Sequence, residues 1–257
     1  MSIKSKNKIR LFVNAVLEPS SRITLPEEAS HYLCNVMRLG AGEVIACFNN
    51  AAGEFDCRIE KAHKKQTEVL VLQQNRKYIP VPDIWVLFAP VKKDKTDFIV
   101  EKSVELGCRL LQPVITERTV VDKIRGERYQ AQAVEAAEQC RRVDLPEIAP
   151  AAPLAEILAH WDCGRTLFFM DETGTGVSAV RAFDERKGCP AALLVGPEGG
   201  FSPSGIAAQS SLCSRSVFGA ENPSGGNRGS RGAFRMAVCC RRLAVIKREI
   251  RFENFGS

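Results

Sequence analysis

The sequence predicts an α/β protein built in two parts, a small β-rich unit followed by a larger unit of alternating strands and helices. Residues 8–73 contain short segments with strand-like alternation or β-branched content. From Asp83 onward, buried strand-like runs alternate with helical segments, which is typical of an α/β domain. Between the two parts lies Gln73–Pro82, a polar stretch that contains Pro80 and Pro82 and reads as a boundary.

Four strands and one helix are expected in the N-terminal part. The expected strands are Lys8–Val13, Glu43–Phe48, Glu54–Glu60 and Glu68–Leu72. Asn49–Gly53 separates the second strand from the third as a hairpin loop would. Pro26–Met37 predicts a helix, because proline is favoured near a helix start.

The larger part is expected to hold a sheet of buried parallel strands. These strands are Ile84–Ala89, Leu110–Ile115, Thr166–Met170 and Ala191–Val195. Helices are expected at Thr96–Leu106 and Glu127–Arg142, with Gly107 just after the end of the first, where a left-handed residue is common.

The segment from Ser204 onward differs in composition from the rest of the chain. Ser, Gly, Arg and Cys dominate Ser210–Arg231, which predicts loop or disorder, and Met236–Ile250 has the composition of a basic helix. Residues 201–257 hold nine basic and three acidic side chains, so they account for the whole formal net charge of +6. Overall charge is therefore no argument for nucleic-acid binding.

Composition excludes several classes of protein. With 45% hydrophobic and 26% charged residues, and no apolar run of the roughly 20 residues that a membrane span needs, the chain is expected to be globular, without a membrane partner. Ten scattered cysteines without a CxxC pair favour reduced thiols in a cytoplasmic protein and give no metal site. The surroundings of His31, His63 and His160 suggest no catalytic role.

The most informative segment for function is Leu193–Ser202, Leu-Leu-Val-Gly-Pro-Glu-Gly-Gly-Phe-Ser. It ends a buried strand with glycines that can take positive φ and admit a ligand close to the backbone. Ligands of open α/β sheets bind at the carboxyl ends of strands. From these residues alone, a small-molecule loop and an ordinary strand-to-helix turn are about equally good interpretations.

Charged groups elsewhere also allow two interpretations. Lys92-Lys93-Asp94-Lys95 is a candidate ligand segment or a solvated charge run, and the i,i+4 pairs Glu101–Glu105 and Phe98–Lys102 fit a helix-surface lattice. Thr116-Glu117-Arg118 follows a strand, where polar residues often face a ligand.

Glu138 and Arg142 fit a surface ion pair at i,i+4. Asp171–Gly174 is either a second ligand loop or a turn.

Taken in order, these segments resemble one known family. The matching pieces are Tyr32-Leu33…Val36-Met37-Arg38-Leu39, Glu101-Lys102…Glu105-Leu106-Gly107, Thr116-Glu117-Arg118, Glu135-Ala136-Ala137-Glu138-Gln139…Arg142 and Val195–Ser202. The chain resembles the bacterial ribosomal RNA small subunit methyltransferase E family of the SPOUT superfamily, which methylates N3 of a uridine in 16S rRNA. The resemblance covers about residues 8–203.

The resemblance implies a PUA-like β-barrel for RNA over residues 1–75 and a SPOUT domain with a trefoil knot over 76–203. It also implies S-adenosylmethionine as cofactor, the 16S rRNA of the small ribosomal subunit as partner, and a homodimer. The cofactor would be bound by Met170, Glu172, Leu194, Val195, Gly196, Pro197, Glu198, Gly199 and Gly200. Lys102, Glu117, Arg118, Gln139 and Arg142 would face RNA or the reaction centre, and Arg38, Lys92, Lys93 and Lys95 would contact RNA.

The chain departs from the family in residues 204–257, which read as an aberrant basic tail. The family's third cofactor segment resembles Val-Ser-Leu-Gly-Pro-Arg-Ile-Leu-Arg-Ala-Glu-Thr, whereas this chain has Ser216–Ser230 without a helix former. Codons for Gly219–Arg228, read one base later, can spell the family segment from its Gly-Pro onward. Our hypothesis is a frameshift between Phe201 and Ser216 that leaves the knot and the cofactor site incomplete.

Three functions follow as expectations. The first is an rRNA methyltransferase, and the second is a non-catalytic RNA-binding protein of the same descent whose cofactor site the altered C-terminus has broken. A nucleotide-phosphate-binding protein is the weakest of the three, because the glycine segment lacks the Lys-Ser/Thr ending of a P-loop.

Overall fold

The computed structural model describes residues 9–119, 124–170, 177–202 and the backbone of 214–218. The contacts divide the chain into two compact units. The first unit comprises Met1–Pro80 together with Ala137–Leu145, and the second comprises Val81–Ala136 and Pro146–Ser257. Within the described residues, no helix is both long and apolar enough to cross a membrane.

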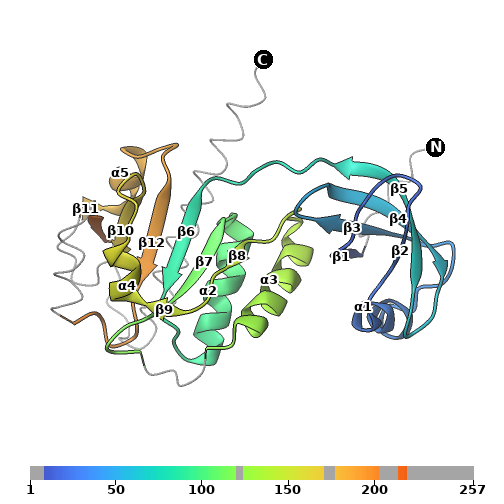
Figure 1. Ribbon diagram of the computed structural model, residues 1–257, viewed down its shortest axis with the longest axis horizontal. Helices are drawn as coiled ribbons and strands as arrows, with labels where there is room; N and C mark the ends of the chain where they lie inside the picture. The colour runs from blue at the N-terminus through green and yellow to red at the C-terminus, as the bar shows by residue number, and fades with distance from the viewer. Residues whose placement is uncertain (1–8, 120–123, 171–176, 203–213, 219–257) are drawn as a thin grey trace, which may run out of the picture. The chain divides into compact units, whose positions relative to one another are not determined.

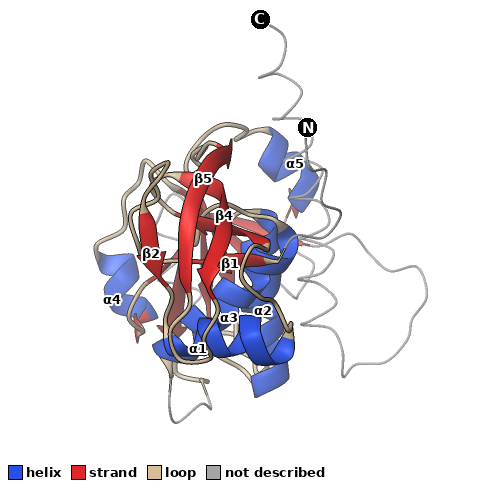
Figure 2. Ribbon diagram, turned by 90° about the vertical axis from the view of Figure 1, so that its right-hand side faces the viewer, coloured by secondary structure: helices blue, strands red, loops and turns tan. Residues whose placement is uncertain are grey.

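The first unit is a five-stranded sheet in the order β1-β3-β4-β5-β2. Its strands are β1 (Arg10–Phe12), β2 (Arg22–Thr24), β3 (Val44–Asn49), β4 (Gly53–Lys61) and β5 (Glu68–Arg76). All neighbours are antiparallel except β1 and β3. The expected hairpin is confirmed, since Asn49 pairs with Gly53 across the turn between β3 and β4, which are labelled in Figure 1. Figure 2 shows β1, β2, β4 and β5 of the same sheet from the side.

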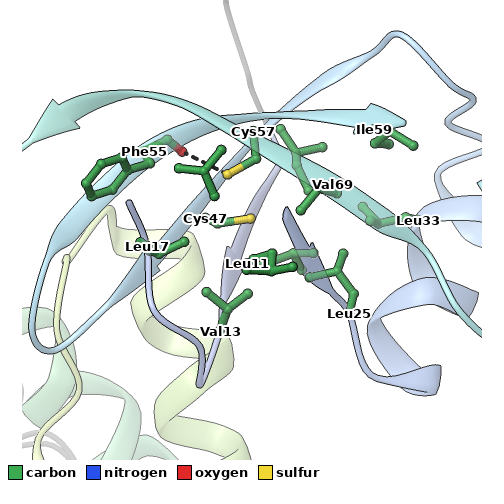
Figure 3. Close-up of a cluster of buried hydrophobic side chains, with 13 residues drawn as sticks. Leu11, Val13, Leu17, Leu25, Leu33, Cys47, Phe55, Cys57, Ile59 and Val69 are labelled. Atoms are coloured by element: carbon green, nitrogen blue, oxygen red, sulfur yellow. Dashed lines mark hydrogen bonds between the residues drawn. The ribbon is translucent and has the colours of Figure 1, made fainter. Parts of the chain in front are cut away.

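The core of the first unit is formed by side chains from every strand and from the adjoining helical segment. Figure 3 shows Cys47 and Cys57 inside this cluster, with Val69 next to Cys57 and Leu11 next to Cys47. Both cysteines are fully buried free thiols. They act here as small apolar residues, and a hydrogen bond with the Cys57 thiol together with burial raises the pKa of Cys47 well above its ordinary value.

One helical segment covers this core, where a single α-helix was expected. It starts as α1 (Glu27–His31), with Pro26 at the N-cap position, and continues as a π-helical turn over Tyr32–Val36. Leu33 is fully buried, whereas Tyr32 is 38% exposed and Val36 60%. π-helical turns are rare and frequently mark functional sites.

The segment Ala137–Leu145 belongs to the first unit through a dense set of hydrogen bonds. Arg10 donates to the carbonyls of Ala137, Glu138 and Arg142, and the Phe12 amide donates to a Glu138 carboxylate oxygen. These carbonyls belong to the end of a helix or follow it, where a cation is favourable. Arg10 therefore anchors the segment.

The second unit is an eight-stranded sheet in which the main path runs β11-β13-β10-β12-β6-β7-β8 and β9 pairs with β7. The strands are β6 (Ile84–Phe88), β7 (Leu110–Ile115), β8 (Glu147–Ile148), β9 (Ala152–Pro153), β10 (Thr166–Met170), β11 (Val177–Ser178), β12 (Ala191–Val195) and β13 (Ser214–Phe218). All the pairings are parallel, so the carboxyl ends of β6, β7, β10, β12 and β13 lie at one edge (Figure 1).

Helices α2 (Lys93–Leu106) and α3 (Gly126–Cys140) lie side by side against this sheet in both views, joined by the ion pair between Arg128 and Asp97. Tyr129 of α3 meets Phe88 of β6 edge to face, with ring centroids 5.8 Å apart. Two short helices, α4 (Leu154–Ala159) and α5 (Ala179–Asp184), cover further strands. Gly107 caps α2 with φ +82°, as predicted.

The structure differs from the sequence-based expectations at several element ends. Helix α2 starts three residues earlier than expected, and β5 continues to Arg76, inside the stretch expected to be a boundary. The short elements β2, β8, β9, β11, α4 and α5 were not expected, because two to six residues carry too little periodicity.

One expectation for the tail is wrong. Ser214–Phe218 was expected to be loop or disorder, but it forms β13, which pairs in parallel with β10 and β11. This segment is a strand because it pairs with two neighbouring strands. Its composition contains no information about that pairing. The expected basic helix at 236–250 and the rest of the tail lie outside the described residues.

Candidate functional site

The candidate site lies at the carboxyl edge of the second unit's sheet. The segment Gly196–Gly200, here called the glycine loop, follows β12. Its neighbours are the connection from β6 into α2 and the connection that follows β7, because β6 lies between β12 and β7. Three loops with chemically active side chains therefore meet at one edge, where ligands of parallel sheets bind.

The glycine loop has a defined backbone conformation. Val195 accepts a hydrogen bond from the Ala89 amide (3.0 Å), which ties the start of the loop to the end of β6. The Gly200 amide donates to the Pro197 carbonyl at 3.0 Å, and Gly200 has φ +70°. A positive φ is readily adopted by glycine, so this turn depends on the residue type at position 200.

Phe201 limits what can stand at Gly196. A Cβ on Gly196 would lie only 2.3 Å from an edge carbon of the Phe201 ring. That ring is held in place by Phe169 of β10, with the centroids 4.9 Å apart in an edge-to-face arrangement. Gly196 is therefore required for close packing, whatever the ligand.

The far end of the glycine loop has room beside its backbone. Among the described residues, a Cβ on Gly200 would have no atom within 4 Å, and one on Gly199 would meet the Arg118 side chain at ordinary contact distance. This room fits a loop that holds a small molecule through peptide groups.

Lys95 and Glu198 connect the glycine loop to α2. The Lys95 Nζ lies 2.6 Å from a Glu198 carboxylate oxygen, and the two side chains are 34% and 45% exposed. The hydrogen bond from Lys95 lowers the pKa of Glu198, with a further contribution from the charge of Lys92. The sequence assigned these residues to different ligands, RNA and the cofactor, whereas the structure pairs them with each other.

Arg118 contacts the glycine loop from the connection after β7. Its Nη1 donates to the Gly199 carbonyl at 2.7 Å, although both residues are exposed. The Thr116 amide donates to the Thr119 hydroxyl at 2.9 Å, which closes the turn that carries Arg118. Glu117, in the same turn, is exposed.

The other predicted basic residues of this unit divide into two groups. Lys92 and Lys93 are exposed at the start of α2. Lys102 is occupied on its own helix, at 2.6 Å from Glu101 and 2.8 Å from Glu105, with its ammonium 5.8 Å from the Phe98 ring centroid. This confirms the expected Phe98–Lys102 contact and helix-surface lattice.

Three predicted residues belong to the first unit. Arg38 is exposed and has φ +56°, and Gln139 is exposed near the end of α3. Arg142 is 8% exposed, and its guanidinium forms two 2.8 Å hydrogen bonds with Asp144. Arg142 does not lie at the surface, as a surface ion pair with Glu138 would require, because its charge is buried against Asp144.

The remaining cofactor candidates lie on the strands themselves or outside the described chain. Leu194 is fully buried, Val195 and Met170 are half-buried at strand ends, and Glu172 lies outside the described residues. No group of three metal-binding side chains occurs in the part of the chain that the structure describes.

The sequence analysis missed Thr96. It is 2% exposed, its hydroxyl donates to the Val91 carbonyl at 2.9 Å, and the same hydroxyl accepts from the Val91 amide. These bonds shape the connection that carries Lys92 and Lys95. A threonine in the first turn of a helix was the available signal.

Comparison with known proteins now gives the family. The model of the RNA methyltransferase domain matches residues 77–215, more than half of the chain, and the model of the RNA methyltransferase PUA domain matches 25–72. The chain belongs to the RNA methyltransferase family. The resemblance to ribosomal RNA small subunit methyltransferase E is confirmed by curated relatives from several bacteria.

Two of these relatives illustrate how far the family likeness extends. The ribosomal RNA small subunit methyltransferase E of Bacillus subtilis (strain 168) is 26% identical over 198 residues, or 72% of this chain and 77% of the relative. That of Buchnera aphidicola (subsp. Schizaphis graminum) is 27% identical over 205 residues, or 75% and 80%.

Solved structures share the fold of this RNA methyltransferase. A methyltransferase of Legionella pneumophila, in complex with the cofactor SAM, has a TM-score of 0.77 and 25% identity over 95% of this chain and 98% of its own. The Neisseria gonorrhoeae ribosomal RNA small subunit methyltransferase E bound to S-adenosyl methionine has a TM-score of 0.77 and 23% identity over 93% and 96%. The predicted fold class, PUA-like strands followed by a SPOUT α/β domain, is confirmed.

Proposed function

We propose that this chain transfers a methyl group from S-adenosylmethionine to N3 of a uridine in the 16S rRNA of the small ribosomal subunit. The observation that carries the proposal is the glycine loop, whose open backbone lies at the carboxyl edge of a parallel sheet in a member of the RNA methyltransferase family. Its relatives are named for small-subunit rRNA methylation.

The residues present fit the cofactor. The backbone of Gly199 and Gly200 has room beside it among the described residues, and the half-buried Met170 and Val195 stand at the carboxyl ends of β10 and β12, at the same edge of the sheet. When bound, S-adenosylmethionine supplies a methyl group on a sulfonium, an electrophile that is transferred in line to its acceptor. Positioning of the two reactants therefore accounts for most of the rate.

The chain's own residues would supply RNA binding and proton removal. Exposed lysines at the start of α2, Lys92 and Lys93, and exposed Arg38 are suited to phosphate contacts. The proton on uridine N3 must leave during transfer, and Glu117 and Gln139 are exposed polar side chains that we assign to the RNA or the reaction centre.

Three further properties are proposed on the family likeness. The family fold implies a homodimer with a trefoil knot in the SPOUT domain, and the frameshift hypothesis predicts that the knot is incomplete in this chain. Its domains are residues 1–75, 76–203 and the aberrant tail 204–257. A ribosomal substrate places it in the cytoplasm.

A calorimetric titration of the full chain with S-adenosylmethionine tests the proposal, followed by methylation of small subunits that lack the modification. One-site binding and incorporation at a uridine N3 are expected. A folded chain that binds the subunit but neither binds the cofactor nor transfers a methyl group would instead be the non-catalytic RNA-binding protein. Residues 216–230, which depart from the family's third cofactor segment, favour that second candidate.

The nucleotide sequence of the gene tests the frameshift hypothesis separately. Codons for Gly219–Arg228 are expected to spell the family segment when read one base later. Codons that cannot encode the family segment in the shifted frame would refute the frameshift hypothesis. The difference from the family would then belong to the protein in its own reading frame.

A further inference from the structure

We infer that Lys95 and Arg118 are positioning residues that clamp the glycine loop from two sides, and that they do not contact RNA. The inference rests on the proposed function, because it assigns these residues a role at the same site. It reassigns two side chains that the family resemblance placed toward RNA or the reaction centre.

The geometry of the clamp is a pair of contacts to consecutive residues. Lys95 reaches Glu198 at 2.6 Å from the start of α2, and Arg118 reaches the Gly199 carbonyl at 2.7 Å from the turn after β7. The two cations come from connections that follow different strands. A displacement of the loop therefore breaks at least one contact, and the clamp reduces the ordering cost that a bound cofactor would otherwise have to offset.

Two lysines at the start of α2 have different surroundings and therefore different roles. Lys95 is half-buried and committed to Glu198, whereas Lys93 is exposed and its ammonium has no hydrogen bond or ion pair with the described residues. The carboxylate of Glu198 partly neutralises the Lys95 ammonium, so Lys95 attracts a phosphate less strongly than an unpaired ammonium does. Lys93 is therefore the better phosphate ligand, and it provides a matched control two residues away.

Arg118 contacts the loop through both parts of its side chain. A Cβ on Gly199 would lie 3.7 Å from the Arg118 Cδ and 3.9 Å from its Cβ, so the aliphatic stem lies against this glycine while the guanidinium binds its carbonyl. Met at position 118 keeps an aliphatic stem and removes the charged donor, whereas Lys keeps one donor. The two variants separate packing from hydrogen bonding.

Hydrogen exchange of the full chain without cofactor is the first test. In R118M, amides of residues 196–202 are expected to exchange about tenfold faster, because a charge-assisted hydrogen bond is lost. In K95M and E198Q the increase is about two- to fivefold, as for an exposed ion pair. K93M should leave this peptide unchanged, while R118K and the charge reversal K95E/E198K should restore most of the protection. Unchanged exchange in R118M and K95M overturns the clamp, whether or not cofactor binds.

Calorimetric titration with S-adenosylmethionine is the second test, combined with the affinity of each variant for a short uridine-containing RNA hairpin. R118M and K95M are expected to weaken cofactor binding by similar factors and to change RNA affinity less than K93M does. If the wild type binds cofactor and the variants bind it equally well, the clamp is overturned and the proposed function stands. If the wild type binds none, the proposed function fails, and the exchange experiment still decides the clamp.

Discussion

Two ion pairs of the same length, one in each unit, have opposite surroundings. In the first unit the Arg10 Nε lies 2.6 Å from Glu54, and their side chains are only 8% and 10% exposed. In the second unit Lys95 lies 2.6 Å from Glu198, with exposures of 34% and 45%. Burial, and not the distance between the charges, therefore determines how much such a pair contributes to stability. The buried pair is a structural requirement of the first unit, whereas the exposed pair can hold a loop and still let it move.

The sheets of the two units explain this difference. Hairpins connect the antiparallel strands of the first unit, and its polar groups meet inside the sheet and at the anchored segment Ala137–Leu145. Parallel strands of the second unit send successive connections to one edge, and Lys95, Arg118 and Glu198 on three of these connections meet at the glycine loop. Other charged groups of this unit serve stability, since the buried Arg165 pairs with Asp83 at 2.6 Å.

The largest effect is expected from Arg10→Met in the first unit. Removal of the guanidinium leaves Glu54 with Arg76 alone and frees the carbonyls of Ala137, Glu138 and Arg142. Loss of one partner of a buried pair destabilises by about 3 kcal/mol. Both tryptophans, Trp85 and Trp161, belong to the second unit. Amides of β3 and β4 should therefore exchange faster with solvent, while the urea midpoint measured by tryptophan fluorescence stays unchanged. A shift of that midpoint as well would contradict the separation of the units.

Gly196→Ala is expected to have the next largest effect, this time in the second unit. Its Cβ would meet the Phe201 ring at 2.3 Å, and such overpacking costs about 1–3 kcal/mol. Cofactor affinity in a calorimetric titration should fall by at least tenfold. Gly199→Ala is the matched control for crowding, because its Cβ would meet Arg118 only at ordinary contact distance, and its free energy of unfolding should stay close to that of the wild type. Equal losses in both variants would show that the crowding at Gly196 is unimportant.

Acid should destabilise the first unit through Glu54. Burial alone would raise the pKa of this carboxyl, but hydrogen bonds from Arg76 and Arg10 outweigh it and hold the pKa below its ordinary 4.5. The stabilisation is therefore present above pH 4.5 and is lost as the pH falls through the folded-state pKa, by at most about 1.4 kcal/mol per pH unit for one group. Urea unfolding followed by far-UV circular dichroism should show this decline, and Glu54→Gln should flatten it. An equally steep decline in the variant would assign the acid sensitivity to other carboxyls.

The smallest effect is expected from Arg22→Met, the surface counterpart of Arg10→Met. Arg22 Nε also lies 2.6 Å from a glutamate, Glu60, but the arginine side chain is 66% exposed. Solvent and salt weaken such a pair, so the unfolding midpoint should not change measurably. A midpoint shift as large as that of Arg10→Met would break the comparison between buried and exposed pairs.

The sequence by itself determined the elements that have strong patterns. The bounds of β7, β10 and β12 agree residue for residue with the expected apolar strands, and Gly107 ends α2 as predicted. Buried parallel strands are recognisable because they read as nearly continuous apolar runs, and a left-handed cap is recognisable because glycine adopts it at low cost. The order of the motifs also identified the family, since their spacing is a property of the chain itself.

Only the tertiary structure decided which charged groups meet. Sequence spacing related Glu138 to Arg142, yet Arg142 binds Asp144 in a buried pair, and Glu138 accepts the amide of Phe12, more than 100 residues away. Lys95 and Glu198 are likewise about 100 residues apart. Such contacts depend on strand order, which brings β6 beside β12, and strand order is set by packing of the whole sheet. For the same reason β13 forms from a stretch whose composition predicts a loop.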